Sequence, residues 1–164
     1  MDMQCVRYVR NVQSVQNVQE DSAKFRTCGC IIECRGEYLF VHQVASGYWG
    51  FPKGTKHDKE STDNCAIREL REETSVVINY NHLGQRFDWN KSRMYLVRLP
   101  EKPLVVVDGF EIDKFKWERL DFLQSKSVSK LTRNMMYKLS TWEKIENHKS
   151  SLTNADRREI VAEL

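Results

Sequence analysis

The sequence has no apolar run approaching the roughly 18 residues that a membrane-spanning helix needs. Its polar N-terminus lacks the apolar segment of a secretory signal peptide. A strong charge of either sign is also missing, because 26 basic and 23 acidic residues leave a net charge of +3. We therefore expect no membrane partner, and the charge alone gives only weak grounds for a nucleic-acid partner. No motif predicts a haem or a nucleotide cofactor, or a particular oligomeric state.

Cysteine is scarce and odd in number, with one residue each at positions 5, 28, 30, 34 and 65. Without a secretory signal, this pattern predicts reduced thiols and a cytoplasmic location. Cys28, Cys30 and Cys34 could ligate zinc with a fourth residue, but no second CxxC or histidine pair lies nearby. Buried strand cysteines are the favoured interpretation.

The first 24 residues differ in pattern from the rest of the chain. Valine recurs at every third position there, as in "VQSVQNVQ", a period that fits neither a helix nor a strand. We interpret residues 1–24 as an arm outside the core, either loosely ordered or binding a partner. The remainder predicts one domain over 25–149 and a short terminal helix or tail over 150–164.

Hydrophobic patterning predicts a mixed α/β domain with flanking helices. A hairpin is expected over 26–43, turning at "RGE", and a helix is expected after an N-cap at Ser61, Thr62 or Asp63. Apolar residues spaced by three or four predict a long amphipathic helix from Val128. Further strands are expected at 75–80, 93–99 and 102–110, with a loop at 115–120.

The stretch "CAIRELREET" at 65–74 places Glu69, Glu72 and Glu73 on one face of a helix, where their like charges repel. Two interpretations remain open on the helix alone. A bound cation can offset the repulsion, or the face is solvated and its carboxylates pair with Arg68 and Arg71.

The preceding loop, "GFPKG", favours the cation. Its glycines free the backbone and Lys53 is suited to bind phosphate. Backbone carbonyls of such a loop can complete the oxygen coordination of Mg²⁺. A loop and helix of this kind suit metal-assisted hydrolysis of a phosphoanhydride, in which one carboxylate takes a proton from the attacking water.

The spacing of three features resembles the Nudix box. They are Gly54, then Glu60 after five intervening residues, then "RELREE" after seven more. The resemblance implies the Nudix fold, an α/β/α sandwich with a mixed sheet, here with an added C-terminal helix, and a Mg²⁺ or Mn²⁺ cofactor. The final glycine of the pattern is replaced by Ser75. A residue other than glycine at this left-handed helix end costs on the order of 1 kcal/mol, without touching the carboxylates.

The resemblance also implies roles for individual residues. Arg68 would orient the carboxylates, and Glu60 would either pair with Arg68 or lie near a metal. The residues expected to hold metal are Gly54 (through its carbonyl or the preceding one), Glu60, Glu69, Glu72 and Glu73. Those expected to act in catalysis are Glu69, Glu72 and Glu111.

Two strings resemble the messenger-RNA decapping enzymes within this family. They are "WGFPKG" (49–54) and "EIDKFKW" (111–117), in which Glu111 matches a general base or extra metal ligand; the alternative is a surface glutamate. The implied reaction is hydrolysis of the cap pyrophosphate of capped RNA, releasing 7-methylguanosine diphosphate. Because only about 25 residues precede the domain, where cellular decapping subunits of this family carry a regulatory domain, we expect a compact viral or divergent type.

Other functions remain open at this point. The "WxxPKG" pattern is shared with dinucleoside-polyphosphate hydrolases, so dinucleoside polyphosphates or diphosphoinositol phosphates are alternative substrates. A Nudix-fold RNA-binding module without catalysis is a further alternative, although the intact glutamates argue against it.

The predicted C-terminal helix has a basic side. Lys126, Lys130, Arg133 and Lys144 fall opposite its apolar face, which suits contacts with an RNA backbone or simply a soluble surface. Four aromatics, Tyr48, Trp49, Phe87 and Trp89, could stack a methylated guanine, although most are expected to pack in the core or in loops. The residues expected to bind substrate are Lys53, Trp49, Lys130 and Arg133.

Overall fold

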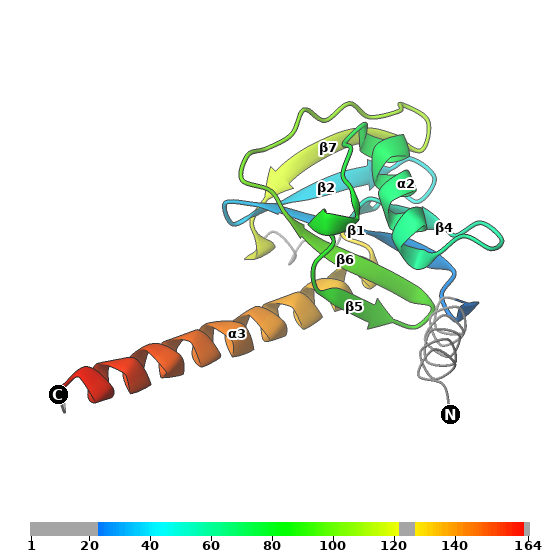
Figure 1. The fold of residues 1–164 in the computed structure, drawn as a ribbon. Coiled ribbons are helices and arrows are strands. Elements are labelled where there is room, and N and C mark those ends of the chain that lie inside the picture. The colour runs from blue at the N-terminus through cyan, green and yellow to red at the C-terminus, as the bar shows by residue number, and fades with distance from the viewer. Residues whose placement is uncertain (1–22, 122–126, 163–164) are drawn as a thin grey trace, which may run out of the picture.

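The computed structural model describes residues 23–121 and 127–162, with side chains as far as residue 151 (Figure 1). The predicted N-terminal arm, apart from residues 23 and 24, lies outside the described residues, as does Lys126. Within the described part of the chain, no helix combines the length and the apolar character needed to cross a membrane.

A mixed sheet forms the centre of the molecule. Strand β1 pairs in parallel with β6, and the other pairings are antiparallel. The strand order is β3-β2-β1-β6-β5, with β4 on β1 and β7 on β2. The strands are β1 (Thr27–Cys34), β2 (Glu37–Gln43), β3 (Trp49–Gly50), β4 (Lys53–Thr55), β5 (Arg86–Trp89), β6 (Ser92–Arg98) and β7 (Ile112–Glu118). The helices are α2 (Thr62–Thr74), α3 (Lys130–Ala162) and the 3₁₀ turn η1 (Tyr80–His82).

The two helices cover opposite faces of this sheet, as the alternation of side chains along β1 shows. Cys30 and Ile32 pack in the cluster beneath α2, with Leu70, whereas Ile31 packs in the other cluster with Met135 of α3. Such alternation is what a strand buried on both faces requires. The predicted α/β/α sandwich with a mixed sheet and a C-terminal helix is confirmed (Figure 1).

Strand β1 changes partner along its length. It pairs with β2 only at Glu33 and Cys34, while its first residues, Thr27 to Gly29, pair with β4. At Gly29 a Cβ atom would collide with the backbone of Pro52 and Lys53, so glycine allows β4 to approach. Strands β2 and β4 therefore diverge from a common neighbour.

Several local predictions are confirmed. The hairpin turns at Arg35 and Gly36, the strand predicted at 93–99 is β6, and α2 begins after Ser61, whose hydroxyl accepts from the amide of Asn64. The cysteines of the described residues are all buried and free.

Other predictions are wrong. Residues 75–79 and 102–110 form no strand, although they are apolar and β-branched. Conversely, 115–120 was expected to be a loop and instead lies largely in β7, and β5 was not predicted. For 75–79, 102–110 and β7 the reason is physical: β-propensity measures how well a side chain suits a pleated surface, whereas a ladder also needs a partner strand. Strand β7 obtains that partner from β2.

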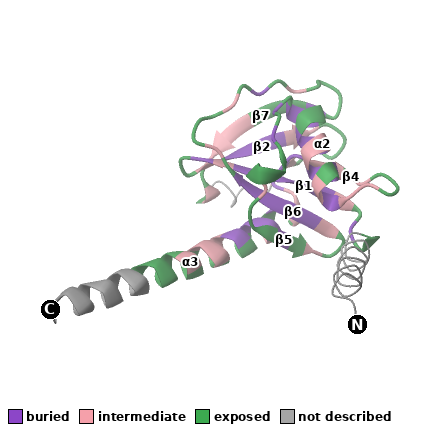
Figure 2. Ribbon diagram, in the orientation of Figure 1, coloured by how far each residue is buried: buried purple, intermediate pink, exposed green. Residues whose placement is uncertain are grey.

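The C-terminal helix is longer than expected. The sequence predicted a separate short helix or tail from residue 150, but α3 continues to Ala162. Its buried residues lie near its beginning, and none of its described side chains after Leu139 is buried (Figure 2). The first part of α3 therefore anchors the helix to the sheet.

The end of α2 has the left-handed geometry that the sequence predicted. Ser75 has φ 60° and ψ 6°, and its amide donates to the carbonyl of Arg71 at 2.9 Å. Its hydroxyl also donates to the carbonyl of Val106 at 3.1 Å. This hydrogen bond, which the sequence did not predict, partly offsets the conformational cost.

This geometry predicts an order of stability for two variants. Ser75→Ala loses the hydroxyl bond and keeps the strained backbone, whereas Ser75→Gly loses the bond but relieves the strain. We expect Ser75→Gly to be more stable than Ser75→Ala by about 1 kcal/mol, measured by urea unfolding. Equal stability of the two variants would show that the left-handed residue is not strained.

Candidate active site

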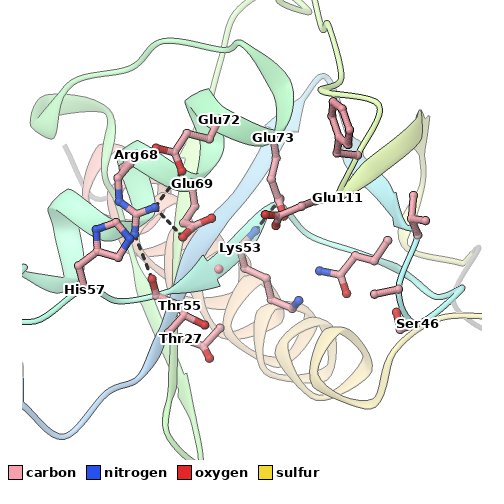
Figure 3. A pocket seen from close by; sticks show the side chains of 15 residues that line it. Thr27, Ser46, Lys53, Thr55, His57, Arg68, Glu69, Glu72, Glu73 and Glu111 are labelled. Atoms are coloured by element: carbon pink, nitrogen blue, oxygen red, sulfur yellow. Dashed lines mark hydrogen bonds and ion pairs between the residues drawn. The ribbon is translucent and has the colours of Figure 1, made fainter.

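A cavity of about 690 Å³ lies beside the divergence of β2 and β4 (Figure 3). Helix α2, strand β4 and the segment before β7 all contribute charged side chains or backbone to its wall. The wall contains six of the residues predicted to bind metal or substrate or to act in catalysis: Lys53, Gly54, Glu69, Glu72, Glu73 and Glu111. The fold thus brings Glu111 to the carboxylates of α2 from a position about 40 residues later in the sequence.

Arg68 is the centre of the charge network on α2. Its guanidinium makes a two-pronged ion pair with Glu60, Nε to Oε1 at 2.8 Å and Nη2 to Oε2 at 3.0 Å. Its Nη1 contacts Glu69 at 2.7 Å and Glu72 at 2.9 Å. Figure 3 shows this one guanidinium among the carboxylates. Arg68 therefore supplies, from the helix itself, part of the positive charge that the crowded glutamates require.

The same guanidinium ties the helix to β4. Nη2 also donates to the carbonyl of Thr55 at 3.0 Å. Hydrogen bonding by Arg68 lowers the pKa of Glu60 to about 2, and the carboxylates in turn raise the pKa of Arg68. Of the two roles the sequence left open for Glu60, the structure shows pairing with Arg68. Glu60 is not among the residues that line the cavity.

Glu73 is the most deeply buried of the three clustered glutamates, with 3% of its surface exposed. One carboxylate oxygen accepts the backbone amide of Lys53 at 3.0 Å. Burial raises the pKa of Glu73 to about 8, assisted by the like charges of Glu69 and Glu111 and opposed by Lys53. In Figure 3 the carboxylates of Glu73 and Glu111 point toward one another. An added positive charge would be favourable at this point.

The close approach of Glu69 favours glycine at residue 54. A Cβ atom at residue 54 would overlap the carboxylate of Glu69. Burial raises the pKa of Glu69, Arg68 lowers it, and Glu72 and Glu111 raise it further. The absence of a side chain at Gly54 therefore lets a buried carboxylate lie directly against the β4 backbone.

Asp108 holds the turn that presents Glu111. Its Oδ1 accepts three successive backbone amides, those of Phe110, Glu111 and Ile112, at 2.9, 3.1 and 2.9 Å. The carbonyl of Glu111 accepts the amide of Val44 at 2.9 Å. Sequence reasoning missed Asp108, although the Asp-Gly pair at 108–109 is a turn signal.

The donor set suits a hard divalent cation. Carboxylate oxygens of Glu69, Glu72, Glu73 and Glu111 and backbone carbonyls of β4 are the ligands such ions prefer. The pKa values of Glu69 and Glu73 are raised first by burial, with a further contribution from the neighbouring carboxylates. Within residues 23–121 and 127–151, no three acidic, histidine or cysteine side chains are placed so that they could hold a metal ion together as they stand. Arg68 instead contacts one oxygen each of Glu69 and Glu72.

The other predicted substrate residues are not among those that line this cavity. Trp49 is half-buried, with the ammonium of Lys116 4.2 Å from its ring centre. Lys130 is exposed at the start of α3. The guanidinium of Arg133 donates to the carbonyl of Val128 at 3.1 and 3.0 Å, so it helps to fix the beginning of that helix.

Comparison with known proteins agrees with this geometry. The family described as NUDIX domain matches residues 24–139, a segment that contains every residue lining the cavity. The mRNA-decapping enzyme subunit 2 of Arabidopsis thaliana is 31% identical over 104 residues, which are 59% of this chain and 28% of that protein. The chain thus spans less than a third of the length of this curated relative.

A bacterial protein and a solved structure extend the comparison. The RNA pyrophosphohydrolase of Shewanella sp. (strain W3-18-1) is 28% identical over 127 residues, 74% of this chain and 70% of that protein. A C. elegans Ap4A hydrolase in a binary complex has a TM-score of 0.58 and 19% identity, covering 71% of this chain and 97% of that chain. At that identity, the structural likeness shows the shared fold.

The raised pKa of Glu73 predicts a pH-dependent stability in the presence of a metal chelator. Between the ordinary glutamate pKa of 4.5 and the raised value of about 8, the folded chain keeps a proton that the unfolded chain has lost. Folding stability contributed by this group therefore falls as pH rises through that window. In Glu73→Gln a neutral amide takes the place of the protonated carboxyl group and does not titrate in this pH range.

We expect Glu73→Gln to be more stable than the parent protein at pH 8, with the difference shrinking toward pH 4.5. Thermal or urea unfolding at several pH values measures this. A constant difference across the range would contradict the raised pKa.

Proposed function

Because this chain belongs to the NUDIX domain family, we propose that it is a Mg²⁺- or Mn²⁺-dependent pyrophosphohydrolase and that its substrate is capped RNA. Hydrolysis of the cap pyrophosphate would release 7-methylguanosine diphosphate. Nudix hydrolases generally use divalent metals. The observation that carries the proposal is the gathering of four glutamates and Lys53 on one cavity.

Each residue has a role in this proposal. Glu69, Glu72, Glu73 and a β4 carbonyl at or before Gly54 would hold the cation, which neutralises phosphate charge and makes water a better nucleophile. Arg68 fixes the orientation of Glu69 and Glu72 through the ion pairs described above. The ammonium of Lys53 binds a phosphate oxygen, and Glu111 accepts the proton of the attacking water.

Capped RNA is favoured by two observations. The Arabidopsis relative is named as a decapping subunit, and α3 carries five basic and two acidic residues over Lys130–Lys149. Basic side chains along an exposed helix contact a phosphate backbone without regard to sequence. The second candidate substrate is uncapped RNA bearing a 5′ triphosphate, from which pyrophosphate would be removed, and it is favoured by the match to most of the bacterial RNA pyrophosphohydrolase.

The activity test uses RNA labelled in the cap, with Mg²⁺ or Mn²⁺. We expect release of labelled 7-methylguanosine diphosphate by the parent protein and a loss of about 100-fold or more in Glu72→Gln. The side chain of Glu72 is 52% exposed, so this variant should unfold at nearly the parental temperature.

Glu101→Gln, an exposed glutamate outside the cavity, is the matched control and should keep full activity. Intact labelled cap with the parent protein, while 5′-triphosphate RNA or free dinucleotides are cleaved, would reject decapping. Unchanged turnover in Glu72→Gln would reject the role of that residue.

A separate prediction concerns Lys130. If its ammonium contacts RNA phosphates, Lys130→Ala should weaken RNA binding and reduce the slope of log affinity against log salt by about 1. Hydrolysis of a free cap dinucleotide should not change. Lys91→Ala, another exposed lysine, is the control. Arg133 is unsuitable because its removal also frees the Val128 carbonyl. An equal loss on RNA and dinucleotide would show that Lys130 acts through the fold.

A further inference from the structure

Phe110 is a large apolar side chain at a position where the fold does not bury it. It is 86% exposed, the highest value among the exposed large hydrophobics of the described residues, and it lines the cavity next to Glu111. A Phe side chain left in water forgoes the favourable transfer that burial gives. Its position therefore suggests that a ligand covers the ring.

The exposure of this ring belongs to an ordered turn. The amide of Phe110 is one of the three that Asp108 accepts, and the amide of Gly109, at φ +79°, donates to the carbonyl of Ile112 at 2.9 Å. The amide of Val44 donates to the Glu111 carbonyl and fixes the turn against the β2–β3 loop. Phe110 is thus presented by a backbone with hydrogen bonds on both sides.

The cavity wall has two chemically different parts. Phe110, Val44 and Ala45 give it an apolar part, and Val44 is itself 49% exposed. The glutamates with Lys53 and Arg68 give it a charged part. A matching ligand carries a flat apolar group next to a pyrophosphate, and a cavity of about 690 Å³ is in the usual range for small-molecule sites.

The aromatics considered from the sequence do not supply this apolar part. Trp49 is covered by Lys116, and Phe87 and Trp89 pack in the cluster beneath α3. Tyr48 is exposed but does not line the cavity. Among the described residues that line the cavity, Phe110 is the one phenylalanine, tyrosine or tryptophan, and the other aromatic ring is the imidazole of His57.

We propose that Phe110 is the platform on which the nucleobase of the substrate stacks while its pyrophosphate lies at the glutamates and Lys53. Every base has a π face, so stacking on Phe recognises a nucleoside without hydrogen-bond readout. Phe110 is then a specificity-determining residue that separates nucleoside diphosphates from other pyrophosphates. The inference rests on the proposed function for the position of the pyrophosphate.

The test measures binding of two non-hydrolysable ligands in the presence of Mg²⁺ by calorimetry. One is the α,β-methylene analogue of guanosine diphosphate, and the other is methylenediphosphonate, which has the same bridge but no base. In Phe110→Ala we expect the nucleotide analogue to bind about 5- to 100-fold more weakly. Affinity for methylenediphosphonate should be unchanged.

Three further variants sharpen the interpretation. Phe110→Trp should retain or raise nucleotide affinity, whereas Phe110→Leu, which is apolar but lacks a π face, should lose most of what Phe110→Ala loses. Leu104→Ala removes a side chain that is 83% exposed outside the cavity and should bind both ligands as the parent does.

The outcomes separate this inference from the proposed function. Parental nucleotide affinity in Phe110→Ala, or an equal loss for both ligands, overturns the stacking role even if capped RNA is hydrolysed. A loss confined to the nucleotide supports the role even if capped RNA is not a substrate. The 7-methylated analogue, compared with the unmethylated one, shows whether the platform prefers the cap base.

Discussion

The ion pairs of Arg68 are the interaction on which the site depends. One guanidinium contacts Glu60, Glu69 and Glu72 and the carbonyl of Thr55. It offsets the repulsion among the carboxylates of α2 and also holds that helix against β4. One side chain therefore both balances charge and positions the helix. Replacing Arg68 with a neutral residue would leave partly buried carboxylates unpaired. This costs more free energy of folding than the ion pairs themselves contribute. Arg68 is for that reason a structural residue inside a chemical site.

The sheet provides the place for this network. Because β1 exchanges β2 for β4 along its length, the ends of β2 and β4 separate. The cavity lies there, with Gln43 at the end of β2 and Gly54 in β4 both in its wall. The segment before β7 reaches the same place because β7 pairs with β2. A change of strand partner therefore brings together charges from three separate parts of the chain.

Local chemistry explains what the sequence could predict. Helix α2 could be predicted from the N-cap at Ser61, the periodic apolar residues and the resemblance to the Nudix box, all of which lie within about 20 residues. Glu111 was found because its spacing to Trp117 resembles a family pattern. Strand β7 was missed because its partner, β2, lies far away in sequence. Strand β5 was missed because it is only four residues long, although it forms a tight hairpin with the neighbouring β6. Trp49 was expected at the substrate, but tertiary packing places it beneath Lys116. Asp108 was missed although the Asp-Gly pair is a turn signal, and Phe110 gives no signal until the turn is folded.

The two parts of helix α3 differ in how strongly the fold constrains their sequence. Its first turns carry Met135, Met136 and Leu139 into the core, while Ser140 to Ser151 contribute no buried side chain. At about 1.5 Å per residue its 33 residues span about 50 Å, more than the domain needs for its own packing. The fold constrains the core-facing turns and also Trp142 and Glu143, which contact Phe87 and Tyr38, whereas the side chains of residues 144–151 are not buried. Evolution can therefore rewrite the second part of this helix for new surroundings without disturbing the carboxylates at the far face of the sheet.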